Sequence, residues 1–309
     1  MALPLDERPY ARLVRKIAPD ATFRRAWTLR GGVSAQVTAF EIAHADGQTQ
    51  KLIARQHGAA DLARNPNIAA DEFRLLQLLR AAGLPAAAPE YLDQSGEIFA
   101  TPVVVVGYIE GEPLLRLDDA PTLVPQLAAQ LARIHHVDCS LDDLSFLPTQ
   151  NDLWAAKCAT RPAQLDNSLD EGRIRDTLEN AWPLAQINPS CLLHGDYWPG
   201  NVLWRDGHIV GVIDWEDAAT GDPLADLANS RLEVLWAFGS DAMHRFTHEY
   251  ARHYAAAAPL DLTNLPYWDL CAALRLLPVI AAMTSDPEDE GRLRAWHREF
   301  TAWAFARLR

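Results

Sequence analysis

Cysteine is scarce in this sequence and widely spaced. The 309 residues hold four cysteines (Cys139, Cys158, Cys191 and Cys271), and no two of them form a C-x-x-C pair. Zinc ribbons need closely spaced cysteine or histidine ligands, and disulfide frameworks are typical of short, cysteine-dense chains, so the sequence supports neither. We therefore expect reduced thiols and a fold that relies on hydrophobic cores. A chain of this length is able to bury one large core or two smaller ones.

Long apolar runs are also missing. The longest strongly apolar stretch, "PVVVVGYI" at 102–109, is far too short to cross a bilayer. The first residues, "MALPLDERPYARLVRK", contain no apolar segment of the kind that a secretory signal requires. Hydrophobic residues make up 49% of the chain and charged residues 22%, as in ordinary globular proteins. We expect a cytoplasmic protein that does not bind a membrane.

There is no basic surplus. The net charge is −13, and residues 1–111 contribute nothing to it, because they hold 12 basic and 12 acidic residues. Residues 112–309 hold 16 basic and 29 acidic residues, which accounts for the whole charge. An acidic surface repels phosphate backbones, so we expect no nucleic-acid partner. The same field attracts cations, although solubility alone is also a sufficient reason for it.

The chain changes character near residues 110 and 111. Before that point the sequence predicts a hairpin around Asp46-Gly47, a helix in "NIAADEFRLLQLLRAAGLP" and a short apolar strand that ends at Gly107 or Gly111. After it, four long segments repeat their apolar residues at helical spacing. We expect an α+β protein with a small β-rich lobe at 1–110 and a larger, mostly helical lobe at 111–309.

One segment of the second lobe holds polar residues in a stiff loop. In "LLHGDYWPGNVLW", Asp196 and Asn201 have the spacing D-x-x-x-x-N, and Asp214 follows in "GVIDWED" after the apolar run "IVGVI". Phosphoryl transfer needs a carboxylate that takes the proton of an attacking hydroxyl, and oxygen ligands that hold Mg²⁺ on nucleotide phosphates. The catalytic loop of protein kinases has its Asp and Asn at this spacing, with a later metal-binding Asp.

The segments "LLHGDYWPGNVLW", "GVIDWEDA" and "GDPLADLA" together resemble the aminoglycoside phosphotransferase family of small-molecule kinases. The resemblance is strongest over 192–228 and extends more weakly from about 25 to 305. It implies a bilobal protein-kinase-like fold. It also implies that Asp196 is the catalytic base, and that Asn201 and Asp214 bind Mg²⁺. His194 and Gly195 would shape the loop, and Asp222 and Asp226 would brace the helix that follows.

The same resemblance assigns the first lobe to ATP. Gly31, Gly32 and Ser34 in "RGGVSAQV" stand where a glycine-rich loop would cover the phosphates, although G-x-G-x-x-G is absent. Arg55 occupies the position of the phosphate-binding lysine, with Lys51 on the same strand face as the alternative. Glu72 would pair with that cation. The backbone around Gly107 to Ile109 would bind the purine, and ATP and GTP are not distinguished.

The sequence thus predicts a kinase that moves the γ-phosphoryl group of ATP, with Mg²⁺, to a hydroxyl of a small acceptor. The acidic second lobe favours an acceptor with positive charge, such as an amine, an amino sugar or an aminoglycoside. A protein kinase and a nucleotide-binding protein without turnover remain alternatives on the same residues. A third alternative is a zinc site on His244 and His248, which stand four apart in a helical segment.

Overall fold

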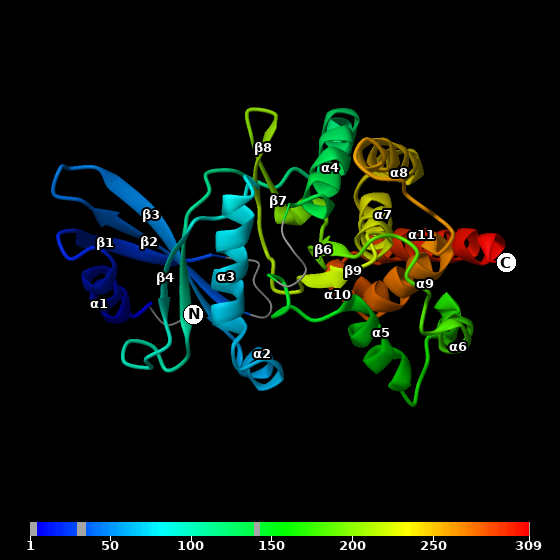
Figure 1. Cartoon of the computed structure of the whole chain (residues 1–309), viewed down its shortest axis with the longest axis horizontal. Helices are drawn as coiled ribbons and strands as arrows, with labels where there is room; N and C mark the ends of the chain where they lie inside the picture. The colour runs from blue at the N-terminus through cyan, green and yellow to red at the C-terminus, as the bar shows by residue number, and fades with distance from the viewer. Residues whose placement is uncertain (1–4, 30–34, 139–142, 309) are drawn as a thin grey trace. The chain divides into compact units, whose positions relative to one another are not determined.

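The computed structural model describes residues 5–29, 35–138 and 143–308 (Figure 1). The chain divides into two compact units. Unit 1 comprises residues 1–111 and 210–216, and unit 2 comprises residues 112–209 and 217–309. The division expected from the sequence placed residues 210–216 in the second lobe, whereas they pack with unit 1. A hydrogen bond from the Val212 amide to the Pro85 carbonyl, 2.7 Å long, contributes to that packing.

Unit 1 is built around one antiparallel sheet. In the described part of the chain this sheet has five strands in the order β1-β2-β3-β5-β4. Its strands are β1 (Thr22–Thr28), β2 (Ala35–Ala43), β3 (Thr49–His57), β4 (Pro89–Asp93) and β5 (Val103–Gly107). Its helices are α1 (Arg8–Ile17), α2 (Ala59–Arg64) and α3 (Ile68–Ala81).

The hairpin expected at Asp46-Gly47 joins β2 and β3. The last strand pair is Ala43 with Thr49. Gly47 has a φ of +84°, a value that residues with a Cβ adopt at a cost, and the Asp46 carboxylate accepts a hydrogen bond of 2.9 Å from the Gln48 amide. The turn sets the strand register, and the register decides which residues of β3 share a face.

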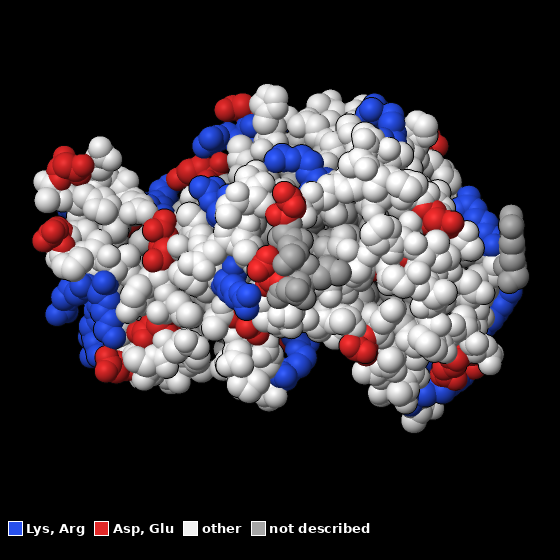
Figure 2. Space-filling model, in the orientation of Figure 1, with Lys and Arg blue, Asp and Glu red and all other residues white. Residues whose placement is uncertain are grey.

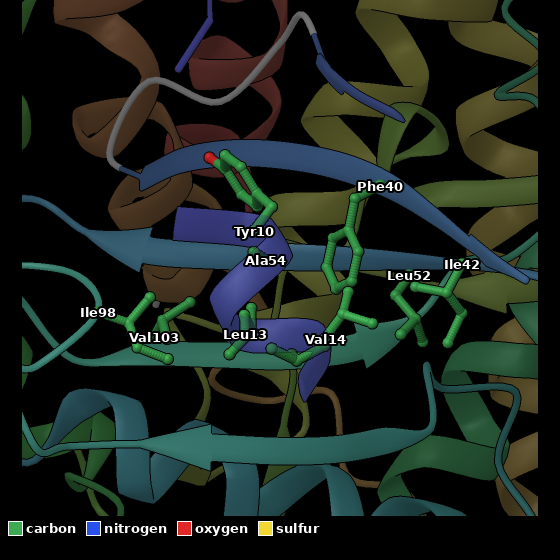
Figure 3. Close-up of a cluster of buried hydrophobic side chains, with 10 residues drawn as sticks. Tyr10, Leu13, Val14, Phe40, Ile42, Leu52, Ala54, Ile98 and Val103 are labelled. Carbon is green, nitrogen blue, oxygen red and sulfur yellow. The ribbon is translucent and has the colours of Figure 1, made fainter. Parts of the chain in front are cut away.

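Helix α1 covers one face of the sheet. Tyr10, Leu13 and Val14 point from this helix onto the strands, where they meet side chains such as Phe40 and Leu52 (Figure 3). These residues belong to a buried apolar cluster, which is completed by Ile42, Ala54, Ile98, Val103 and Val105. Apolar burial of this kind stabilises a fold by roughly 25 cal/mol per Å² removed from water.

The other face of β3 carries polar residues. Side chains alternate along a strand, so the odd-numbered Lys51, Arg55 and His57 point away from the face that Leu52 and Ala54 give to α1. Helix α3 packs on β3, β4 and β5, and its Glu72 contacts both Arg55 and His57. The sheet therefore separates an apolar layer under α1 from a charged layer under α3.

Unit 2 is mostly helical, in accordance with the α+β fold predicted from the sequence. Its α-helices are α4 (Ala120–His135), α5 (Gln150–Ala159), α6 (Glu171–Ala181), α7 (Leu224–Phe238), α8 (Ser240–Ala255), α9 (Leu265–Leu276), α10 (Ile280–Met283) and α11 (Pro287–Arg307). Short 3₁₀ turns are η1 (Leu117–Asp119), η2 (Asn167–Leu169), η3 (Pro199–Asn201) and η4 (Leu277–Val279). Strand β6 (Cys191–Leu193) pairs with β9 (Ala219–Gly221). Strand β7 (Val202–Arg205) pairs with β8 (His208–Val212), whose residues from Val210 onward are assigned to unit 1.

Helices α7 and α9 form the centre of unit 2. Both are buried along nearly their whole length, and they pack on each other, while α8 and α11 also pack on α7 (Figure 1). Of the described residues, only the segment Leu265–Met283 is long and apolar enough to cross a membrane, and 61% of it is buried inside the protein. That burial is typical of a core helix.

Charged side chains of both signs are interspersed over the face shown in Figure 2. Most of that face is uncharged, and its basic side chains gather in small groups, one of them at the lower left next to acidic side chains.

Candidate active site

The loop that carries Asp196 begins where β6 ends. Gly195 has a φ of +82°, and a Cβ on it would collide with the backbone carbonyl of Asp217. The position therefore excludes every residue with a side chain, for reasons of both backbone conformation and space. This glycine turns the chain sharply between the buried His194 and the more accessible Asp196, whose side chain is 25% exposed.

Helix α7 holds this loop from beneath through Asp226. The Asp226 carboxylate accepts hydrogen bonds from the backbone amides of His194 (2.6 Å) and Gly195 (2.9 Å). It also lies 3.3 Å from Nε2 of His135, a buried residue at the end of α4. Burial by itself raises the pKa of Asp226, but the hydrogen bond and charge of His135 hold it below the ordinary value. An ionised carboxylate thus fixes the loop by bonds to its backbone.

Asp196 and Asn201 are in direct contact. Asn201 Nδ2 donates to the Asp196 carbonyl (2.9 Å) and to Asp196 Oδ2 (3.0 Å). The Asn201 Oδ1 atom accepts no hydrogen bond from any described residue. The pair therefore presents a carboxylate held in one orientation and, beside it, an amide oxygen that is available as a ligand.

A third residue reaches Asp196 from helix α9. Arg275 Nη2 lies 2.5 Å from Asp196 Oδ1 and 3.7 Å from Asp217 Oδ2. Its Nη1 lies 3.9 Å from Glu233 Oε1, too far for a hydrogen bond. Burial, and then the charge of Asp196, raise the pKa of Glu233 to about 8, so Glu233 is mostly neutral near pH 7.

Unit 1 gathers charges around Arg55. Its Nε lies 3.0 Å from Glu72 Oε1, and its Nη2 lies 3.3 Å from Asp214 Oδ1 and 3.5 Å from Glu216 Oε2. Burial raises the pKa of Glu72, but Arg55 and the hydrogen bond to His57 outweigh that effect and lower it. The cation expected on β3 and the acid expected on α3 therefore form a buried ion pair.

The alternative residue Lys51 is placed differently. Its ammonium group lies 2.6 Å from Glu110, and its side chain is 38% exposed, against 13% for Arg55. Lys51 also stacks over the ring of Tyr108 at 5.3 Å. Of the two cations, Arg55 is the one that contacts both Glu72 and Asp214.

Asp214 follows β8 with an unusual backbone. Its φ of +67° is in the left-handed region, which residues other than glycine rarely adopt. Its side chain remains 37% exposed although it contacts Arg55. Strain of this kind is commonly retained where a side chain must point in a particular direction.

The residues expected at the purine lie at the end of β5. The amides of Gly107 and Tyr108 donate within unit 1, to the carbonyls of Ala88 and Lys51. The Ile109 amide, by contrast, has no hydrogen-bond partner among the described residues. Gly31, Gly32 and Ser34, the expected phosphate loop, lie outside the described residues.

Several residues of these clusters were not expected from the sequence. His57 lies two residues after Arg55 on β3. Side chains alternate along a strand, so the sequence already indicated that these two residues share a face. Arg275 is the one charged residue in the apolar run "CAALRLLPVI", and a lone arginine in a buried helix suggests a partner. Glu233 gave no comparable signal, because helix α7 carries several charged residues.

The alternative zinc site finds no support in the described residues. Among them, no group of three or more histidine, cysteine, aspartate or glutamate side chains is arranged to hold a metal ion. His244 instead stacks near Trp303, with ring centroids 5.3 Å apart.

Comparison with known proteins agrees with this fold. The amicoumacin kinase hAmiN, solved in complex with AMP-PNP, Ca²⁺ and Ami, superposes with a TM-score of 0.67 at 16% identity, covering 97% of this chain and 94% of that chain. The macrolide 2'-phosphotransferase MphH of Brachybacterium faecium superposes with a TM-score of 0.62 at 19% identity, covering 95% and 98%. The fold is therefore the bilobal protein-kinase-like fold of small-molecule phosphotransferases.

Sequence comparison gives the family. The chain matches the phosphotransferase enzyme family over residues 28–274, and it belongs to that family. The resemblance to aminoglycoside phosphotransferases is thereby confirmed. Homoserine kinase of Gluconobacter oxydans is 27% identical over 218 residues, which cover 66% of this chain and 67% of that protein. Acyl-CoA dehydrogenase family member 11 of Rattus norvegicus is 24% identical over 228 residues, and the match spans only 29% of its length.

Proposed function

We propose that this protein is a small-molecule kinase that transfers the γ-phosphoryl group of ATP to a hydroxyl group of its acceptor. The observation that carries the proposal is the Asp196–Asn201 pair, which is held by Asp226 in a loop with no room for a side chain at position 195. Asp196 would orient the acceptor hydroxyl and take its proton, and such a base typically contributes 10²- to 10⁴-fold in rate.

The chain offers suitable ligands for Mg²⁺. Asn201 has an amide oxygen without a hydrogen-bond donor among the described residues, and Asp214 has a partly exposed carboxylate. Both are oxygen ligands of the type that Mg²⁺ takes in phosphotransferases. When bound, the ion would neutralise charge on the transferring phosphate, and these two residues would hold it.

Arg55 is suited to the phosphates of ATP. Its guanidinium group is kept in one place by Glu72, and a guanidinium binds phosphate oxygens in a bidentate manner. Its contacts with Asp214 and Glu216, at 3.3 and 3.5 Å, are long enough to give way to a closer anion. The amide of Ile109, which has no hydrogen-bond partner in the described part of the chain, would meet the purine edge. ATP as donor also agrees with a cytoplasmic location.

A protein kinase is the second candidate, on the same residues. It is disfavoured because only seven residues separate Asp214 from Asp222, which leaves no length for an activation segment. A binding protein without turnover is disfavoured because Asp196, Asn201 and Asp214 are all present. Fold does not determine the acceptor. The acidic surplus of residues 112–309 favours an acceptor that carries an amine, such as an amino sugar or an amino alcohol.

The test is a screen for ADP release with Mg·ATP. A panel of hydroxylated metabolites, antibiotics and serine-containing peptides separates the candidates directly. Turnover with a small alcohol, lost in Asp196→Asn, supports the proposal. Turnover with peptides alone would make the protein kinase the better reading. Tight nucleotide binding with no acceptor-dependent ADP release would favour the binding protein.

A further inference from the structure

We propose that Arg275 is a positioning residue of the phosphoryl-transfer step, and that it acts by holding the Asp196 carboxylate in the orientation that receives the acceptor proton. This inference rests on the proposed function, since it assigns a further residue to the same site. It starts from a cation of helix α9 that neither the nucleotide assignment nor the metal assignment uses.

Arg275 reaches Asp196 from a buried element. Helix α9 is buried along nearly its whole length and packs on α7. From the end of this helix, Arg275 Nη2 donates a hydrogen bond of 2.5 Å to Asp196 Oδ1. Asp196 lies 79 residues earlier in the chain, in the loop that follows β6. The contact therefore ties a side chain of the loop to the core of unit 2.

The two central helices of unit 2 hold this loop at two levels. Helix α7 holds its backbone, because the Asp226 carboxylate accepts hydrogen bonds from the amides of His194 and Gly195. Helix α9 holds the Asp196 carboxylate through Arg275. The other donor to that carboxylate, Asn201, belongs to the loop itself. Among the described residues, Arg275 is thus the one hydrogen-bond donor that fixes the carboxylate relative to another element.

The other acids near Arg275 do not explain its placement. Asp217 Oδ2 lies 3.7 Å from Nη2 and Glu233 Oε1 lies 3.9 Å from Nη1, both too far for a hydrogen bond. Glu233 is also mostly neutral near pH 7, since burial and then the charge of Asp196 raise its pKa to about 8. The side chains of Arg275 and Asp196 are 22% and 25% exposed, and an ion pair at such a site adds little to stability. The orientation of Asp196 is therefore the better reason for the contact.

The two donors leave the carboxylate able to take a proton. An ionised carboxylate has about four lone-pair sites. Asn201 takes one on Oδ2 and Arg275 takes one on Oδ1, so each oxygen retains a site for the acceptor hydroxyl. In the transfer, the hydroxyl oxygen bonds to the γ-phosphorus, the bond to the ADP oxygen breaks, and the hydroxyl proton passes to Asp196. A displacement of about 1 Å costs up to about 10²-fold in rate, so the clamp should act on kcat.

The first experiment measures steady-state ADP release with Mg·ATP and the acceptor that the screen identifies. Arg275→Met keeps the length of the side chain but removes its donors, so kcat should fall roughly 10- to 100-fold. The KM for ATP should change less than about 3-fold, because no contact with the nucleotide is lost. Arg275→Lys should recover part of the rate, since it keeps a cationic donor without the planar fork. The control Arg175→Met removes a buried arginine of α6 that pairs with Glu171, and should keep the wild-type kcat.

The second experiment asks whether Arg275 acts through Asp196. In the Asp196→Asn background, Arg275→Met should lower kcat by less than about 3-fold, because the group that it positions is no longer a base. Equal losses of kcat in both backgrounds, or a normal kcat in Arg275→Met alone, would overturn the inference. If melting curves show that Arg275→Met does not fold, Arg275→Lys replaces it in the same cycle, with the same two outcomes.

The proposed function and this inference fail in different ways. A wild-type protein that releases no ADP with any acceptor would contradict the proposed function, and this inference with it. Turnover that is lost in Asp196→Asn but is unaffected by Arg275→Met would leave the proposed function standing and overturn this inference alone.

Discussion

At the scale of single residues, the Asp196 side chain is contacted on both of its carboxylate oxygens. Asn201 donates to one carboxylate oxygen and Arg275 to the other. The two contacts fix the orientation of the carboxylate. A general base must lie within hydrogen-bond reach of the proton that it takes, so its orientation is the first requirement.

We predict that Asp196→Asn lowers kcat by roughly 10² or more while Mg·ATP still binds, because the amide keeps the shape of the carboxylate but cannot take a proton. The measurement is steady-state ADP release together with nucleotide titration. Asp206→Asn, in the exposed β7–β8 turn, is the matched control and should have wild-type rates. An Asp196→Asn enzyme with normal kcat would remove Asp196 from the role of base.

Gly195 allows a prediction about backbone geometry. Gly195→Ala introduces a Cβ that collides with the Asp217 carbonyl, so we expect lost activity and a clear fall in melting temperature. Gly207→Ala is the control: its φ is +76°, but a Cβ there meets nothing within 4 Å. Only the conformational cost of about 1–2 kcal/mol should appear in that variant. Similar melting temperatures and activities for both variants would contradict the collision.

At the scale of secondary-structure elements, β3 separates two roles by its alternation. Leu52 and Ala54 belong to the apolar cluster under α1, whereas Arg55 and His57 reach Glu72 on α3. One strand therefore ties the core of unit 1 to its charged cluster. A register shift of one residue would exchange the two faces.

The two cations of β3 are expected to differ in their effect on ATP. Arg55→Ala should raise the KM for ATP about 10-fold or more, because a charged contact of the phosphates is lost. Lys51→Ala should change it less than about 3-fold, because Lys51 pairs with Glu110 on an exposed surface. Initial rates over a range of ATP concentrations, with melting temperatures to check folding, compare the variants. The opposite ranking would assign the phosphates to Lys51.

Helices α7 and α11 meet at a buried histidine whose protonation is unfavourable. His297 has no exposed surface, lies beside Trp236 and has no hydrogen bond on either ring nitrogen within the described residues. Burial lowers its pKa to about 4. Below pH 6.5 the unfolded chain therefore binds a proton that the folded protein does not, and stability falls as the pH drops from about 6.5 to about 4.

His297→Leu should remove that dependence. At pH 7 the variant should be about as stable as the wild type, because an unpaired ring is replaced by an apolar group of similar size. At pH 5 it should be more stable by roughly 2 kcal/mol, the linkage expected for this shift. Urea unfolding between pH 5 and 7 measures the difference. The exposed His248→Leu is the control, and a His297→Leu curve parallel to the wild type would refute the assignment.

At the scale of the whole molecule, ligand binding should raise the free energy of unfolding, because the ligand binds the folded state. A ligand at about 100 times its Kd stabilises the folded state by about 2.7 kcal/mol. We expect Mg·ATP to raise the melting temperature by several degrees, and ATP without Mg²⁺ to raise it less, because Asp214 and Asn201 are proposed to hold the ion.

Asp214→Ala should lose the Mg²⁺-dependent part of this shift while the shift with ATP alone remains. Thermal melts with ATP, with and without Mg²⁺, measure both parts. The control Asp20→Ala removes an exposed acid of the same unit and should behave as the wild type. A Mg²⁺-dependent shift that survives in Asp214→Ala would mean that Asp214 only ends a strand.

The sequence by itself determined the α+β class, the hairpin at Asp46-Gly47, the helix that ends before Gly83 and the family to which the motif of residues 192–228 points. These features depend on local periodicity, turn residues and short spacings, and all of these can be read from residues that are close together in the sequence. Only the tertiary structure decided that Arg275 reaches Asp196 and that His57 shares Glu72 with Arg55. Those partners lie on different elements, and chain folding alone determines which distant side chains meet.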